Sequence, residues 1–262
     1  MDKEVVFFHK IAPEIIELVQ NELANNKVIK QKGHSSNFAT KIDVAVERLI
    51  VDNIKRNFPD DQILAEEEHG DGDIDEGRIW IIDPICGTGN LGRNIPNYCT
   101  NIALAIDGEL VASMVVDYAN RQYYWSVGEQ KIWCNDAEYQ LPAPVPSTLI
   151  EIDFGAIPSG TPDDRTRHLK GIVYLQEDTD YMLCSLNTSL SGLYAALHKI
   201  DGYYCARNHP WDIAASAFLM RQSGVILKDE NGDDWTLKSR GYIAATSQEV
   251  FDVLMKAFAP NK

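Results

Sequence analysis

The stretch RIWIIDPICGTGN, residues 78–90, joins the strongest strand pattern in the chain to a glycine-rich turn. Residues 78–83 form a short apolar run that ends in an acid, which predicts a buried strand with Asp83 at its end. Proline and two glycines follow, so a turn is expected directly after the strand. The small residues of segment 87–90 allow its backbone N–H groups to approach an anion such as phosphate, although a tight turn without a ligand is commoner.

Two other acidic positions have settings similar to that of Asp83. Glu66 opens a run of three glutamates directly after the apolar segment 63–65, and Asp212 opens the apolar-rich helical pattern 212–223. Strand ends and helix starts hold side chains rigidly toward a cleft, and hard cations such as Mg²⁺ bind oxygen ligands of this kind. Each acid also has a simpler interpretation: a solvated surface for the glutamates, a turn residue for Asp83 and a helix N-cap for Asp212.

Hydrophobic periodicity and turn residues divide the rest of the chain into helices and strands. Asp43 is expected to cap the second helix, and the proline-rich segment 139–147 is the best boundary between two lobes. We therefore predict a single domain of residues 1–262, with an antiparallel-rich α+β lobe at 1–143 and an α/β lobe at 144–262. The expected helices are 4–26, 43–57, 162–169, 188–199, 212–223 and 247–258. The expected strands are 63–65, 78–83, 101–106, 110–118, 122–126, 149–154, 172–175, 202–206, 225–228 and 242–245.

The composition is that of an ordinary globular protein with a strong acidic excess. A net charge of −15 over 262 residues argues against a general nucleic-acid binder, because no basic excess is present to neutralise phosphates. No run approaches the roughly 20 apolar residues that span a bilayer, and the N-terminal segment predicts an amphipathic helix rather than a secretion signal. The five cysteines are scattered without a Cys-x-x-Cys pair, which indicates neither a disulfide framework nor a structural zinc site. We expect a cytoplasmic protein without membrane or nucleic-acid partners.

Four motifs occur together in this chain. They are Thr40-x-x-Asp43, ILAEE at 63–67, WIIDPICGTGN at 80–90 and PWDIAA at 210–215. From about residue 38 to the C-terminus the chain resembles the inositol monophosphatase family, within the lithium-sensitive, metal-dependent sugar-phosphatase superfamily. The resemblance implies a layered αβαβα sandwich that hydrolyses a small phosphomonoester, such as an inositol phosphate or a sugar phosphate, to an alcohol and inorganic phosphate. It also implies Mg²⁺ as the cofactor and a homodimer.

The resemblance assigns roles to the residues that match the family's motifs. The implied metal ligands are Glu66, Asp83, Ile85 through its backbone carbonyl, and Asp212. The residues implied in catalysis, which would hold and activate the attacking water, are Glu66, Thr88 and Asp43. The residues expected to bind substrate are Ile85, Gly87, Thr88, Asn187 and Asp212, with the amides at 87 and 88 on the phosphate. A helix N-cap role is equally open to Asn187.

Cys86 stands where the family's motif has a second aspartate, which is a ligand of the second metal. Three interpretations stay open. The cysteine is a neutral filler in an enzyme with fewer protein ligands, a ligand in a site that takes Zn²⁺ or Mn²⁺ instead of Mg²⁺, or the mark of lost or redirected activity.

Cys205 lies seven positions before Asp212, where the family carries an acidic residue that contacts inositol hydroxyls. The substrate therefore stays open between an inositol phosphate, another sugar phosphate and a 3′(2′),5′-bisphosphate nucleotide. A non-catalytic family member that binds a phosphorylated ligand is the alternative outside enzymes.

Overall fold

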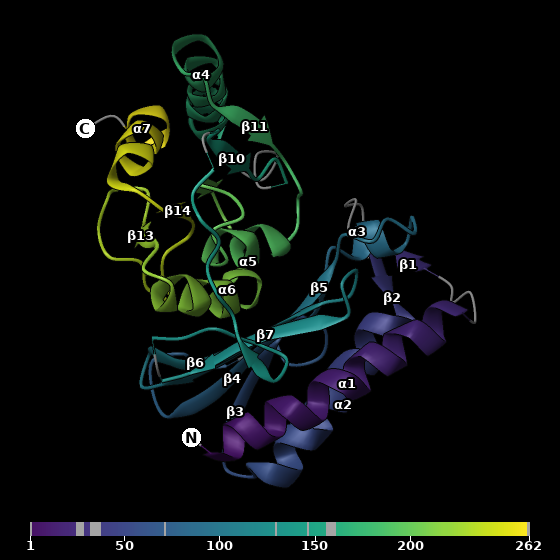
Figure 1. Cartoon of the computed structure of the whole chain (residues 1–262). Helices are drawn as coiled ribbons and strands as arrows, with labels where there is room; N and C mark the ends of the chain where they lie inside the picture. The colour runs from purple at the N-terminus through teal and green to yellow at the C-terminus, as the bar shows by residue number, and fades with distance from the viewer. Residues whose placement is uncertain are drawn as a thin grey trace.

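Helices and sheets alternate in an αβαβα arrangement (Figure 1). The computed structural model describes residues 2–24, 29–31, 38–70, 72–128, 130–145, 147–155 and 161–260. Within these residues, two large sheets lie on either side of a central helical layer, and a further pair of helices covers the outer face of each sheet. This is the layered sandwich that the sequence predicted.

The larger sheet is built from strands that follow one another along the chain. Its order is β3-β4-β5-β6-β7-β8-β9; β3 and β4 pair in parallel, and every later pair is antiparallel. The predicted antiparallel meander is therefore confirmed. The strands are β3 (Gln62–Ala65), β4 (Arg78–Cys86), β5 (Cys99–Ile106), β6 (Glu109–Asp117), β7 (Gln122–Val127), β8 (Trp133–Cys134) and β9 (Ala137–Glu138). The outer helices are α1 (Asp2–Ala24) and α2 (Lys41–Asn57), beside the antiparallel pair β1 (Ile29–Gln31) and β2 (Phe38–Thr40).

The smaller sheet has the order β11-β10-β12-β14-β13. β10 pairs in parallel with β11 and β12, so the carboxyl ends of these strands share one edge, where ligands commonly bind in such sheets. The strands are β10 (Leu149–Ile152), β11 (Met182–Cys184), β12 (Gly202–Cys205), β13 (Ile226–Lys228) and β14 (Tyr242–Ala245). The helices are α4 (Pro162–Asp178) and α7 (Gln248–Phe258) outside, α5 (Leu190–Ala196) and α6 (Pro210–Gln222) between the sheets, and the short α3 (Thr88–Leu91) after β4.

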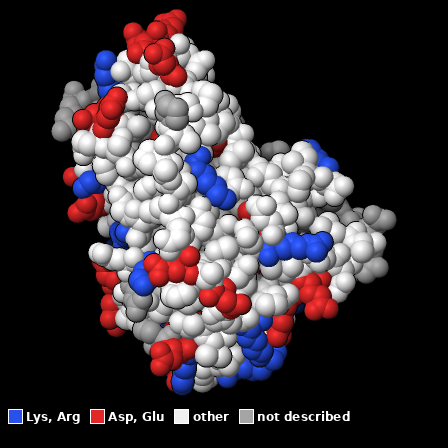
Figure 2. Space-filling model, in the orientation of Figure 1, with Lys and Arg blue, Asp and Glu red and all other residues white. Residues whose placement is uncertain are grey.

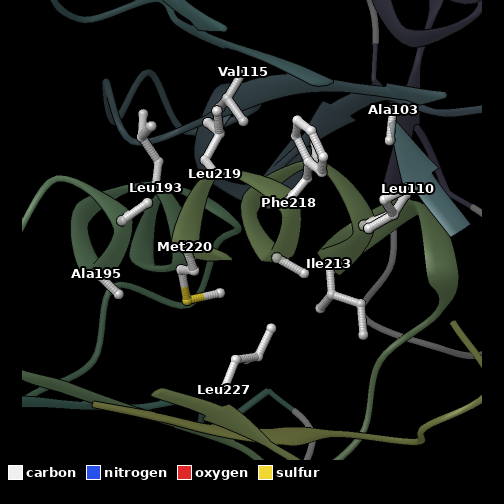
Figure 3. Packing of buried hydrophobic residues seen from close by; sticks show 14 of the residues in the cluster. Ala103, Leu110, Val115, Leu193, Ala195, Ile213, Phe218, Leu219, Met220 and Leu227 are labelled. Atoms are coloured by element: carbon white, nitrogen blue, oxygen red, sulfur yellow. The ribbon is translucent and has the colours of Figure 1, made fainter. Parts of the chain in front are cut away.

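Helix α6 lies between the two sheets and is buried around most of its circumference. Figure 3 shows Phe218 and Leu219 on the side of the larger sheet, while Met220 faces Leu227 of the smaller sheet. A helix that is apolar on all sides belongs in a core, and close packing there leaves it little freedom to move. The residue near its start, Asp212, is therefore held in a fixed position.

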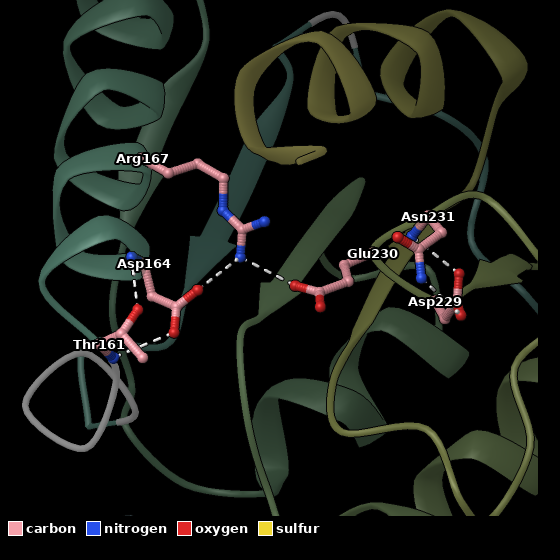
Figure 4. A network of polar contacts seen from close by, with 6 residues as sticks. All are labelled: Thr161, Asp164, Arg167, Asp229, Glu230 and Asn231. Atoms are coloured by element: carbon pink, nitrogen blue, oxygen red, sulfur yellow. Dashed lines mark hydrogen bonds and ion pairs between the residues drawn. The ribbon is translucent and has the colours of Figure 1, made fainter. Parts of the chain in front are cut away.

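The expected strand 172–175 is wrong, because α4 continues through it. The start of α4 is secured by a capping box: the Thr161 hydroxyl accepts from the Asp164 backbone N–H, and the Asp164 carboxylate accepts from the Thr161 N–H (Figure 4). Arg167, one turn later, forms an ion pair with Glu230 at 2.9 Å (Figure 4). A well-capped helix with a tertiary anchor can extend through residues that prefer strands.

The second half of α4 is held by α7. Gly171 lies so close to Phe258 that an added Cβ atom would come within 2.4 Å of its ring. Gly171 is thus a site of close helix–helix packing. The strand position beside β10 belongs instead to β11, which the sequence analysis missed.

Two expectations in the first half of the chain need correction. α2 begins at Lys41, so Asp43 lies inside the helix and is not its N-cap. Its buried carboxylate accepts a hydrogen bond from Thr88 instead of capping the backbone. β4 runs through to Cys86, so the strand does not end at Asp83, and the turn begins at Gly87.

The surface of the protein is mixed in charge. On the face shown in Figure 2, lysines and arginines are interspersed with acidic side chains. Across the described residues, no helix has both the length and the apolar character needed to cross a membrane. Residues 139–145 form neither helix nor strand and lead from the larger sheet to the smaller one. The division into lobes at this point stays a prediction.

Candidate metal and phosphate site

A bulge in β4 brings two chemically active side chains to one side of the strand. In the ladder with β5, Asp83 lies opposite Asn101 and Cys86 lies opposite Cys99, so β4 has one more residue than β5 over this interval. On a regular strand, residues three apart point to opposite faces. The extra residue in the bulge brings the side chains of Asp83 and Cys86 to the same face. Pro84, which has no N–H to give to the ladder, lies inside the bulge.

Asp83, Cys86 and Asp212 form a candidate metal site. One ligand atom from each, a carboxylate oxygen or the cysteine sulfur, lies within 4.8 Å of the other two. Asp83 is only 1% exposed, and neither of its carboxylate oxygens has a hydrogen-bond partner in the described structure. A buried carboxylate without donors is costly unless a cation compensates it. The residues therefore fit a divalent ion.

The electrostatics of this cluster point the same way. Burial raises the pKa of Asp83 well above its ordinary value, and the neighbouring acidic groups, Cys86 and Glu66 foremost, raise that pKa further. Burial also raises the pKa of Asp212 to about 6. Carboxyl groups that disfavour one another's charge in a shared site are compensated when a cation binds between them.

Asp212 is presented by the first turn of α6. The N-cap of this helix is His209, so the simpler interpretation of Asp212 as an N-cap is wrong. Oδ2 of Asp212 accepts a hydrogen bond from the His209 backbone N–H at 2.9 Å, which fixes the orientation of the carboxylate. The imidazole of His209 is exposed and stacks on Trp211, with ring centroids 4.7 Å apart.

Glu66 follows β3, and its backbone N–H donates to the carbonyl of Ile82 at 3.2 Å, which places it beside the β4 residue that precedes Asp83. The loop that carries it is anchored by the buried carboxylate of Glu47 in α2. Oε2 and Oε1 of Glu47 accept from the backbone N–H groups of Glu67 and Glu68 at 2.7 and 2.8 Å. His69 contacts the same carboxylate at 3.0 Å. A fully buried acid thus holds the loop by direct hydrogen bonds.

Thr88 and Asp43 meet across the layers. The Thr88 hydroxyl lies 2.8 Å from Oδ1 of Asp43 and 3.0 Å from the carbonyl of Ile85, so it can donate to either. Asp43 and Glu47 are four residues apart on α2 and therefore share one face of that helix. One face of α2 supports both the Thr88 turn and the Glu66 loop.

Gly87 permits the turn into α3. Its φ of 95° lies in the left-handed region that glycine adopts without strain. A Cβ atom at this position would lie 2.9 Å from the carbonyl oxygen of Asn97. The first N–H groups of a helix have no acceptor within it, so the amides that follow Gly87 can be offered to an anion.

Residues of the second half of the chain complete the site. The Ser189 backbone N–H donates to Sγ of Cys86 at 3.1 Å, and its hydroxyl lies 2.9 Å from that sulfur and 2.6 Å from the carbonyl of Asp212. The side-chain amide of Asn97 donates to the carbonyl of Leu186 at 2.7 Å. These contacts tie the glycine-rich turn to the segment before α5.

A model of the inositol monophosphatase family matches residues 1–261. The chain belongs to the inositol monophosphatase family. Inositol-1-monophosphatase of Synechocystis sp. is 28% identical over 235 residues, which cover 88% of this chain and 80% of that protein. Nus factor SuhB of Escherichia coli (strain K12) is 28% identical over 207 residues, covering 77% of this chain and 75% of SuhB. The solved structure of the Thermotoga maritima IMPase has a TM-score of 0.81 at 24% identity and covers 98% of both chains.

Membership of the inositol monophosphatase family makes this chain a metal-dependent phosphomonoester hydrolase that acts on small phosphate esters. The resemblance inferred from four motifs is thus confirmed, together with the sandwich fold. The individual residue roles stay predictions, although Glu66 and Asp212 both lie close enough to Asp83 to raise the pKa of its carboxyl group.

Cys205, which stands where the family carries an acidic residue, lies beside the carboxylate of Asp153. Cys205 is buried at the end of β12, and its thiol donates to Oδ2 of Asp153 at 3.6 Å. Asp153 directly follows β10, and its negative charge helps to raise the pKa of Asp212, which indicates proximity. A carboxylate is therefore present beside the position where the family's acid is missing, but it comes from the adjacent strand.

Sequence analysis missed three residues that support this site: Glu47, Ser189 and Asp153. Glu47 could have been found by its spacing of one helical turn from Asp43. Asp153 lies one residue before the end of the predicted strand 149–154, and an acid near a strand end was a usable signal. Ser189 carried no signal, because its partners lie in β4 and α6 and only the fold brings them together.

Proposed function

We propose that this phosphatase hydrolyses the phosphomonoester of a small polyol, an inositol phosphate or a related sugar phosphate, with Mg²⁺ bound at Glu66, Asp83 and the carbonyl of Ile85. The observation that carries the proposal is Asp83, a buried carboxylate without hydrogen-bond donors beside a second acidic residue, Asp212. When bound, divalent ions would polarise the ester phosphate and make a water more acidic.

The residues of the chain would do the orienting. Glu66 and the Thr88–Asp43 pair would hold the attacking water in line with the scissile bond. By donating its proton to Asp43, the Thr88 hydroxyl would keep its lone pairs free to accept a hydrogen bond from that water. The amides of Gly87 and Thr88 would hold the phosphate, and such fixed dipoles supply much of the catalysis in phosphoryl transfer.

The substrate alcohol would lie against Asp212, Asp153 and Asn187. Asn187 has a φ of 54°. A Cβ atom added at Gly155 would contact the side-chain oxygen of Asn187 and a carboxylate oxygen of Asp153, so these two side chains lie on the same side of the loop. These side chains would accept hydrogen bonds from neighbouring hydroxyls, which favours a polyol over a simple alkyl phosphate.

The alternative outside enzymes is a non-catalytic phospholigand-binding member, and the observation that favours it is Cys86 at a metal-ligand position. The relative SuhB carries the name Nus factor, which does not describe a phosphatase. A 3′(2′),5′-bisphosphate nucleotide is the alternative substrate. We also propose a cytoplasmic homodimer; the five free cysteines suit a reducing compartment.

The test is phosphate release from a panel of inositol phosphates, sugar phosphates and adenosine 3′,5′-bisphosphate, with and without Mg²⁺. The proposal expects Mg²⁺-dependent turnover that is fastest with a polyol phosphate. A preference for the bisphosphate nucleotide would contradict the proposed polyol phosphate substrate. Tight binding without turnover of any substrate would show that the protein is a binding protein and not an enzyme. Gel filtration with light scattering tests the dimer.

A further inference from the structure

We propose that Cys86 is itself a metal ligand, and that with Asp83 and Asp212 it forms a site selective for a thiophilic divalent ion of the zinc class over Mg²⁺. The inference rests on the proposed metal-dependent function and adds the selectivity of the second metal position. It replaces the open choice between a neutral filler, a ligand and a mark of lost activity.

The first support is geometric. The β4 bulge turns the Cys86 side chain toward Asp83, and its sulfur lies within 4.8 Å of carboxylate oxygens of Asp83 and Asp212. Zinc binds cysteine sulfur at about 2.3 Å and carboxylate oxygen at about 2.0–2.2 Å, so side-chain shifts of about an ångström bring all three atoms to bonding distance. Cys86 is half-buried, which leaves a route for an ion.

The second support is the state of Asp83. Both of its oxygens are buried and lack hydrogen-bond partners within the described residues. A neutral cysteine beside it would leave that carboxylate uncompensated, because a thiol is a weak donor. A cation held between the sulfur and the carboxylates supplies the missing partner.

The third support is Ser189, which touches two of the three ligand residues. Its backbone N–H donates to the Cys86 sulfur at 3.1 Å, and its hydroxyl lies 2.9 Å from the same sulfur. That hydroxyl is also 2.6 Å from the carbonyl of Asp212. A backbone N–H donor such as that of Ser189 orients a metal-ligating sulfur and stabilises the negative charge of a thiolate.

The selectivity follows from the chemistry of sulfur. Mg²⁺ takes hard oxygen ligands, whereas a thiolate favours Zn²⁺ and ions like it. On binding, the thiol proton passes to solvent as the sulfur–metal bond forms, so each ion bound to Cys86 releases one proton. Where the family's aspartate would bring a hard oxygen ligand, Cys86 brings a soft one.

The experiment uses full-length, metal-stripped protein under reducing conditions, with Co²⁺ as a spectroscopic probe of the zinc class. We expect a near-ultraviolet sulfur-to-cobalt charge-transfer band that saturates with one Co²⁺ per chain and disappears when Zn²⁺ is added. Excess Mg²⁺ should leave the band in place. Cys86→Ser should abolish the band and weaken Zn²⁺ binding by at least about tenfold.

Matched variants decide which sulfur is responsible. Cys134→Ser, in β8, should keep the band, whereas Cys86→Asp should lose it and shift the Zn²⁺-to-Mg²⁺ affinity ratio toward Mg²⁺ by about tenfold or more. The inference is overturned if wild-type protein shows no band, if Cys86→Ser retains it, or if Cys99→Ser removes it while Cys86→Ser does not.

The inference and the proposed function fail separately. A cobalt–thiolate band without phosphate release on any substrate would support the metal site at Cys86 and contradict the proposed phosphatase activity. The opposite result is Mg²⁺-supported phosphate release by a protein that shows no band, with the same Zn²⁺ affinity in Cys86→Ser as in the wild type. It would support the phosphatase activity and contradict the role of Cys86 as a metal ligand.

Discussion

The hydroxyl of Thr88 lies 2.8 Å from Oδ1 of Asp43, a carboxylate that α2 and its neighbours bury completely. The two residues are 45 positions apart in the chain and come from different layers. A buried acid that accepts from the half-buried Thr88 hydroxyl sets the direction in which that hydroxyl's lone pairs point. That direction is what a water-orienting group needs.

Asp43→Asn removes the charge behind Thr88 while keeping the side chain's shape. We expect kcat to fall by about 100- to 10,000-fold, the range of general acid–base contributions, with KM little changed. Thr88→Ser retains the hydroxyl and serves as the control, with a far smaller loss. Steady-state phosphate release measures both, and an Asp43→Asn enzyme with wild-type kcat would show that the pair is only structural.

Glu47→Gln tests the support of the Glu66 loop. The amide keeps one acceptor oxygen where the carboxylate had two, so one backbone N–H of Glu67 or Glu68 loses its partner. The free energy of unfolding should fall by about 1–3 kcal/mol. Urea denaturation measures this change. Glu68→Gln breaks only the surface pair with Arg48, and we expect no measurable change from it; equal effects of the two variants would contradict this account.

Asp153→Asn tests the carboxylate beside Cys205. If Asp153 accepts from substrate hydroxyls, the variant should raise KM for the best polyol phosphate by about tenfold, roughly the worth of one hydrogen bond from a neutral group. The KM for p-nitrophenyl phosphate, which has no such hydroxyls, should stay the same. A parallel rise for both substrates would show that Asp153 supports the site without contacting the alcohol.

His168 predicts how stability depends on pH. It is 2% exposed, neither ring nitrogen has a hydrogen-bond partner among the described residues, and burial lowers its pKa to about 4. The unfolded chain takes up this proton near pH 6.5 and the folded protein only near 4, so the stabilisation is complete above 6.5 and lost as pH falls through that window. The total loss is about 3 kcal/mol.

His168→Phe should remove that loss, because phenylalanine can occupy the space between Tyr204 and Phe258 without titrating. Denaturation curves at pH 7 and pH 4.5 give the comparison. The same decline with pH in the variant and the wild type would assign the effect to other groups.

Much of the fold was readable from periodicity. The strands of the meander, whose alternation is imperfect, and the buried helix that starts near Asp212 were predicted from local patterns, and the structure confirms them. The strand expected at 172–175 failed because β-branched residues there pack as part of a helix. Contacts distant in the sequence favour the helix there, namely the Arg167–Glu230 ion pair and the packing of Phe258 against Gly171.

Only those residues of the candidate site that belong to sequence motifs could be predicted from the sequence. The acids at 66, 83 and 212 were recognised from their motifs, but the bulge that turns Cys86 toward Asp83 depends on pairing with β5. Ser189 is equally invisible, since its two partners come together only through the packing of α6 between the sheets. Long-range geometry decides these positions, and periodicity does not encode it.

The proposed role of the Asp83 carboxylate is to hold the metal on which phosphate release depends. Its most direct test is phosphate release from the best polyol phosphate by chelator-treated wild-type and Asp83→Asn proteins, each with Mg²⁺ and Zn²⁺ added back and with folding verified by circular dichroism. We predict that wild-type activity returns only with metal, and that the folded variant stays more than about a hundredfold slower with every metal. Metal-independent wild-type activity, or equal rates for the two proteins, would contradict the claim.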